Sequence, residues 1–241
     1  MIASLGMYDH PAQQAANDRF WSAIRARLGD GPERLSRDRD LWNIWQSPDL
    51  LFAQTCGLPF RARLHDRVTP IGTADYGLDG CPPGHYCSLF VTRGKPLAEL
   101  TDGTFAFNDT GSESGWAGPG RHLDSLGLRF KQTLETGAHA LSARAVAEGR
   151  ADAAAIDAQT WRSLSKHEDW TRGLTVVDAT PPTPGLLFIT AKGRDPEPIF
   201  QAVAGAIDGL SAEDRETLGL RGVVKLPADA YLAVPLPAEP A

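Results

Sequence analysis

The turn at residues 108–116, NDTGSESGW, constrains this 241-residue chain more than any other stretch. It follows an apolar alternation at residues 104–107 that predicts a strand, and it leads into a segment that predicts a helix over residues 114–123. Small hydroxyl residues between glycines at such a turn leave backbone N–H groups free, and a helix N-terminus carries about half a positive charge. The turn therefore predicts an anion-binding site, with an ordinary helix-capping loop as the alternative.

Four consecutive residues of this turn are candidate ligands of an oxyanion. The hydroxyls of Ser112 and Ser114 can donate hydrogen bonds, as can the backbone N–H groups of Glu113, Ser114 and Gly115. We expect the Ser112 hydroxyl to bond to the ligand without supporting the core. The substitution Ser112→Ala would then barely change the stability of the ligand-free protein. The carboxylate of Glu113 would repel a dianion strongly in a dry cleft, so we expect it to point away from the ligand.

Residues 136–157 supply two further candidates, His139 and Asp157. Their pattern predicts a helix over residues 140–148 and a buried strand over residues 153–156 that ends in Asp157. His139 can donate a hydrogen bond to an anion, charge-assisted if the ring is protonated. Asp157 can face a cationic or hydroxyl group of a ligand, or it can cap the helix that follows it.

Several short pieces of the chain, taken in order, resemble one known family. They lie at residues 4–9, 54–57, 80–88, 112–115, 139, 146–157 and 180–185. In this order and spacing the chain resembles the phosphate/phosphite/phosphonate-binding proteins of ABC importers. That family has the type II periplasmic-binding-protein fold.

The resemblance implies a two-lobed α/β fold with a ligand cleft between the lobes. Residues 1–92 and 186–241 would form the first lobe and residues 93–185 the second. Two chain crossings, near residues 92–95 and 183–188, would form the hinge. Hydrophobic periodicity by itself supports only the α/β class.

The resemblance also implies a solute-binding protein that captures a small phosphorus oxyanion of the phosphonate, phosphite or phosphate type. An ABC permease would be its partner, the chain would be a monomer, and neither catalysis nor a cofactor would be involved. The implied ligand residues are Tyr8, Gln54, Tyr86, Ser112, Glu113, Ser114, Gly115, His139 and Asp157. Tyr8 follows a predicted strand, where open α/β sheets bind ligands, although it can equally pack on the first helix.

Two other functions stay open at this stage. The chain can be a cytoplasmic ligand sensor or an orphan binding protein of the same fold. It can also be a serine hydrolase that uses Ser112, His139 and Asp157, the residue types of a hydrolytic triad. Against the hydrolase, the middle residue of GSESG is Glu113, whereas a nucleophile elbow places serine there.

The bulk composition excludes several classes of partner. A net charge of −6 argues against nucleic acid and anionic membranes, and the sequence has no metal-binding motif. No run of about 18 apolar residues predicts a membrane span. A strand-like run begins at Ile2 in place of a signal peptide, so either a leader was trimmed from a periplasmic protein or Met1 starts a cytoplasmic one.

The three cysteines, Cys56, Cys81 and Cys87, do not form a disulfide framework. Buried free thiols are the expectation, and one bridge between Cys81 and Cys87 is the alternative.

Overall fold

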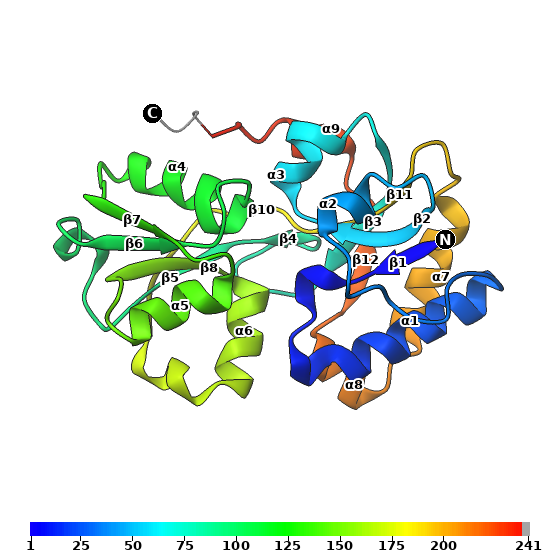
Figure 1. Cartoon of the computed structure of the whole chain (residues 1–241), viewed down its shortest axis with the longest axis horizontal. Helices are drawn as coiled ribbons and strands as arrows, with labels where there is room; N and C mark the ends of the chain where they lie inside the picture. Colours follow the sequence, from blue (N-terminus) through cyan, green and yellow to red (C-terminus); the bar gives the residue numbers. More distant parts are fainter. Residues whose placement is uncertain (238–241) are drawn as a thin grey trace. The chain divides into compact units, whose positions relative to one another are not determined.

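The computed structural model describes residues 1–237, which fold into two compact units (Figure 1). Unit 1 consists of Met1–His85 and Pro184–Val234, and unit 2 of Tyr86–Thr183 together with residues 235–237. Each unit combines one β-sheet with helices, which confirms the α/β class expected from the sequence.

The sheet of unit 1 brings together strands from both ends of the chain. In spatial order its strands are β1 (Ile2–Ser4), β2 (Leu50–Thr55), β11 (Leu187–Ala191), β3 (Val68–Asp75) and β12 (Gly222–Val224). β1 runs parallel to β2, whereas β11 runs antiparallel to both of its neighbours. Every residue of β2 is buried, because helices cover both faces of the sheet.

Two helices of unit 1 end at a glycine in the left-handed conformation. The helices of the unit are α1 (Gln14–Leu28), α2 (Leu41–Trp45), α3 (Gly57–Pro59), α7 (Glu197–Asp208), α8 (Ala212–Leu218) and α9 (Ala228–Leu232), with shorter turns η1 (Gly6–Tyr8), η2 (Pro11–Gln13) and η3 (Phe60–Leu64). Gly29 ends α1 with a φ of 72°, and Gly219 ends α8 with a φ of 67°. Arg19 of α1 forms a bidentate ion pair with Asp214 of α8, so these two helices are joined by charge as well as by packing.

Unit 2 is built from the continuous middle of the chain. Its sheet has the order β7 (Gln132–Glu135), β6 (Thr104–Phe107), β8 (Ala153–Asp157), β5 (Ser88–Thr92) and β9 (Thr175–Ala179). Its helices and turns are η4 (Leu97–Glu99), η5 (Glu113–Ala117), α4 (Gly118–Ser125), α5 (His139–Ala147), α6 (Ala158–His167) and η6 (Asp169–Gly173). β6 is parallel to β7 and β8, and β5 is antiparallel to β8 and β9.

Helices α4 and α5 cover opposite faces of the unit 2 sheet (Figure 1). Phe105 and Phe107 of β6 pack with Leu123 of α4 in one hydrophobic cluster. Ala106, between them, packs with Ala143 of α5 in a second cluster, as the two-residue period of a strand requires. The turn that connects β6 to α4 therefore has access to both faces of the sheet.

The chain passes between the units three times. β4 (His85–Tyr86) and β10 (Thr183–Pro184) pair as a two-stranded sheet at two of the passages, and the third lies between Val234 and Pro235. The expected boundary after residue 92 falls too late, because β5 pairs with β8 and β9 and so belongs to unit 2. The third passage was not expected.

Two strands of the structure are poorly marked in the sequence. The strand that follows α4 is β7, whereas Leu128 and Phe130, just before it, pack in the cluster beside α4. β7 is an exposed edge strand, so its side chains carry almost no apolar signal. The opening strand β1 is short, because the chain turns into η1 soon after Ser4.

No disulfide forms among the cysteines of the described chain, so Cys81 and Cys87 are not bridged. Within residues 1–237 we find no helix with the length and hydropathy needed to cross a bilayer. The same residues hold no cluster of His, Cys, Asp and Glu suited to a metal ion.

Candidate functional site

The turn after β6 folds as one wide helical turn, η5, that runs directly into α4. Ser112 is its N-cap residue, and its Oγ atom accepts a hydrogen bond from the N–H of Gly115 at 3.0 Å. The N–H of Gly115 was expected to face a ligand, but the cap already uses it. Ser112 Oγ is the acceptor in that bond, so its own hydrogen remains available for donation.

Ser114 and His139 form the central contact of this site. Ser114 Oγ lies 2.9 Å from His139 Nε2, which joins η5 to the first residue of α5. His139 Nδ1 is buried and has no hydrogen-bond partner within residues 1–237. The structure thus brings Ser112, Ser114, Gly115 and His139 together, and their role as ligands of an oxyanion stays a prediction.

Burial controls the charge of the His139 ring. It lowers the pKa of His139 to about 4, although an interaction with the backbone of Ala155 acts in the opposite direction and raises the pKa in part. The imidazole is therefore neutral at pH 7 without ligand. A bound anion would favour the imidazolium form and raise this pKa again.

Asn108 is a site residue that the sequence analysis did not single out. A Cβ atom on Gly115 would lie 1.7 Å from Asn108 Oδ1 and 3.3 Å from His139 Cε1, so only glycine fits at this position. Asn108 Oδ1 is buried and lacks a hydrogen-bond partner in the described part of the chain. Its only signal in the sequence is its place between the strand and the turn.

The side chain of Glu113 turns the other way from Ser114. Its buried carboxylate forms an ion pair with Arg121 of α4, whereas Ser114 bonds to α5 on the opposite face of the sheet. Arg121 and Glu113 line a cavity of about 180 Å³ within unit 2. Arg121 was also missed from the sequence, because a single arginine within a predicted helix has no distinguishing pattern.

Asp157 has the capping role that the sequence left open. Its carboxylate accepts a hydrogen bond from the N–H of Thr160 at 2.8 Å, at the start of α6. His139 Nδ1 has no hydrogen-bond partner in residues 1–237, so this ring nitrogen is not bonded to Asp157. Ser114 Oγ is the hydroxyl that lies 2.9 Å from His139 Nε2, whereas the hydrolase hypothesis assigned that contact to Ser112.

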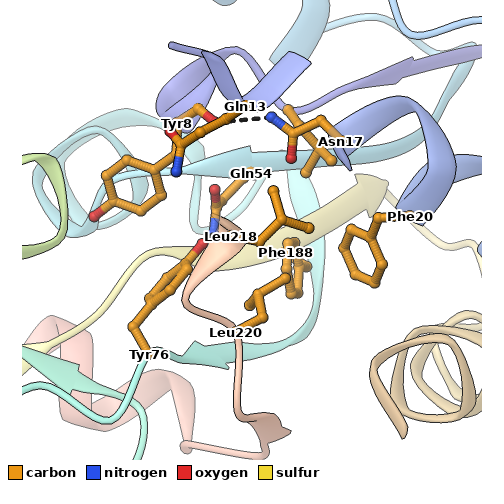
Figure 2. Close-up of a pocket in the computed structure, with 10 residues that line it drawn as sticks. Tyr8, Gln13, Asn17, Phe20, Gln54, Tyr76, Phe188, Leu218 and Leu220 are labelled. Carbon is orange, nitrogen blue, oxygen red and sulfur yellow. Dashed lines mark hydrogen bonds between the residues drawn. The ribbon is translucent and has the colours of Figure 1, made fainter. Parts of the chain in front are cut away.

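Tyr8 and Gln54 meet in unit 1 beside a third residue, Tyr76 (Figure 2). The rings of Tyr8 and Tyr76 are 5.2 Å apart and almost perpendicular, and Gln54 Nε2 donates to the Tyr76 hydroxyl at 3.1 Å. The cavity that these residues line has a volume of about 10 Å³, close to the space that one water molecule needs. Tyr76 is a residue of this cavity that the sequence analysis did not single out.

Tyr86 is buried in β4, with 2% of its surface exposed. It lines neither the cavity beside Tyr8 nor the one beside Arg121. Its predicted role as a ligand residue stays a prediction.

Several solved structures have a similar fold. PhnD1 from Prochlorococcus marinus (MIT 9301), in complex with methylphosphonate, is 18% identical over 95% of this chain and 93% of that chain, with a TM-score of 0.73. A binding protein component of an ABC phosphonate transporter from Pseudomonas aeruginosa is 18% identical over 95% and 82% of the two chains, with a TM-score of 0.71. XAC2383 from Xanthomonas citri, bound to chloride ion, is 15% identical over 97% of each chain, with a TM-score of 0.67.

These likenesses define the class: the fold is that of the two-lobed type II periplasmic binding proteins. A family model described as "ABC transporter, phosphonate, periplasmic substrate-binding protein" matches residues 49–228, and the chain belongs to that family. The resemblance drawn from the short sequence pieces is thereby confirmed. No curated protein matches the chain.

Proposed function

We propose that this protein captures a small phosphorus oxyanion, of the phosphonate, phosphite or phosphate type, as the solute-binding component of an ABC importer. The observation that carries the proposal is the Ser114–His139 contact of 2.9 Å, at the start of the helical segment that Ser112 caps. Membership of the phosphonate-binding family supports the same ligand class.

The site offers hydrogen-bond donors in place of a permanent positive charge. A phosphorus oxyanion would accept from the hydroxyls of Ser112 and Ser114 and from the N–H groups of Glu113 and Ser114. Its negative charge would raise the pKa of His139, and the protonated ring would donate a charge-assisted bond. The N-terminal end of η5 and α4 adds a favourable dipole.

The other predicted ligand residues have separate places in this proposal. The part of the ligand outside the anion site would contact Tyr8, Gln54 and Tyr76. Tyr86 and Asp157 are kept as predicted contacts, and the carboxylate of Asp157 would favour a ligand with a cationic or hydroxyl group. We further propose that the protein acts as a monomer with an ABC permease and that it binds its ligand without chemical change.

A thermal-shift screen, followed by calorimetry, tests the proposal. The panel contains phosphate, phosphite, methylphosphonate and 2-aminoethylphosphonate, with sulfate and methanesulfonate as matched non-phosphorus anions. At 100 times its dissociation constant a ligand stabilises the folded state by about 2.7 kcal/mol, which corresponds to roughly 5–10 °C for a chain of this size. The absence of a shift with every phosphorus oxyanion would contradict the proposal.

A further inference from the structure

Glu113 places a carboxylate inside the turn proposed to bind an anion. Only 3% of its side chain is exposed, so solvent screens its charge poorly. Coulomb repulsion between this carboxylate and a bound oxyanion would oppose binding. The neighbouring residues must therefore determine whether the ligand meets that charge.

Arg121 neutralises the carboxylate from the next turns of the same helical segment. One guanidinium nitrogen, Nη2, pairs with Glu113 Oε1, and the other, Nη1, donates to the carbonyl of Pro235 at 3.2 Å. Gly118 leaves room for this pair, because a Cβ there would lie 3.2 Å from Glu113 Oε1 and 3.7 Å from Arg121 Nη2. The guanidinium of Arg121 thus has two acceptors, Glu113 Oε1 and the carbonyl of Pro235.

The pair also separates the charge from the oxyanion donors. Glu113 and Ser114 are consecutive, yet Ser114 bonds to His139 of α5 while Glu113 bonds to Arg121 of α4. These two helices pack against opposite faces of the unit 2 sheet. The acidic side chain and the donor side chain of the turn are therefore bonded to two different helices.

We propose that Arg121 is a positioning residue that sets the charge of the oxyanion site. It holds and neutralises the Glu113 carboxylate on the α4 side, so that the turn presents only donors to the ligand. This inference rests on the proposed function. Without Arg121 the buried Glu113 carboxylate would lose the guanidinium that faces it, and the affinity for anions would fall.

A double-mutant cycle tests the inference. Arg121→Met keeps a long apolar side chain but removes the charge, and Glu113→Gln keeps the shape of the carboxylate without its charge. Arg129→Ala is the matched control, since Arg129 is an exposed arginine, 3.7 Å from Asp124, whose loss changes the net charge equally. Calorimetry with methylphosphonate and with inorganic phosphate measures the four proteins of the cycle and the control.

We expect Arg121→Met to weaken both affinities by about tenfold or more, with a larger loss at low ionic strength. Glu113→Gln should bind at least as tightly as the unmodified protein, and adding it to Arg121→Met should restore the affinity. A purely structural role for Arg121 would leave the double variant as weak as Arg121→Met. Arg129→Ala should bind normally.

Three outcomes would overturn the inference. An Arg121→Met variant that binds both anions normally would show that the pair does not affect the site, and the proposed function would survive. A double variant without recovery would show that Arg121 acts through packing rather than charge. If the unmodified protein bound neither anion nor any other phosphorus oxyanion, the proposed function and the inference would fall together.

Discussion

The Oδ1 atom of Asn108 occupies the space that a side chain on Gly115 would need, since a Cβ there would lie 1.7 Å from it. The carboxamide at the end of β6 thus requires glycine inside the oxyanion turn. Because Ser112 bonds to the N–H of the same glycine, a shift of its backbone would move the cap and Ser114 together.

We predict that Gly115→Ala abolishes oxyanion binding and lowers the melting temperature, because the turn must move away from Asn108. Removing the obstacle with Asn108→Gly in the same protein should recover part of both losses. Gly120→Ala is the control, since Gly120 lies in α4 with open space around it, and it should stabilise the helix by about 0.5–1 kcal/mol. Calorimetry and thermal denaturation measure these effects. Normal binding by Gly115→Ala would contradict the predicted collision.

Substitution of the two serines should change the stability of the ligand-free protein by different amounts. Ser112→Ala should destabilise it by about 1 kcal/mol, because an N-cap hydrogen bond is lost. This corrects the expectation from sequence that its stability would barely change, which overlooked the bond from Gly115. Ser114→Ala should have the smaller effect on stability, and both variants should weaken oxyanion binding. Equal melting temperatures for Ser112→Ala and the unmodified protein would argue against the cap.

Acid should destabilise the ligand-free protein through His139. Its pKa is lowered to about 4 in the folded state, from an ordinary value of 6.5. Between these values the unfolded chain binds more protons, so the free energy of unfolding falls as the pH falls through this window. His139→Asn should flatten this part of the profile, whereas His65→Asn, at an exposed position, should leave it in place. Urea denaturation from pH 7 to 4 measures the profiles, and parallel profiles for His139→Asn and the unmodified protein would exclude this contribution.

The carbonyl of Pro235 should contribute to the stability of unit 2. A chain that stops after Val234 loses this acceptor for Arg121 Nη1, and we expect a loss of about 1 kcal/mol. A chain that stops after Pro237 keeps the acceptor and should melt at the original temperature. Differential scanning calorimetry compares the two truncations. Identical melting of both would mean that the Pro235 contact contributes nothing.

The sequence predicted the parts of the site that depend on local pattern. Ser112 and Ser114 belong to a strand-to-helix turn that is marked in the sequence by Gly111 and Gly115. His139 begins a predicted helix that a glycine terminates. The contact of Ser114 with His139 rather than with another group follows from the way α5 packs beside β6 and β8. That packing depends on alanines, which carry little positional information in the sequence.

The parts that could not be predicted depend on contacts between distant residues. Arg121 becomes important only because its guanidinium reaches Glu113, and Asn108 only because its carboxamide faces Gly115. The membership of β5 in unit 2 is decided by pairing with β8 and β9, which follow it by many residues in the chain. Periodicity finds a strand but does not identify its neighbours.

The third passage of the chain has a practical consequence for measurement. Strand β1 opens the chain in unit 1, while Pro235 belongs to unit 2. A fluorescent donor fused ahead of β1 and an acceptor fused behind the C-terminal segment would therefore be attached to different units. Energy transfer between the two labels would report any ligand-dependent movement of one unit against the other, without a label inside either sheet.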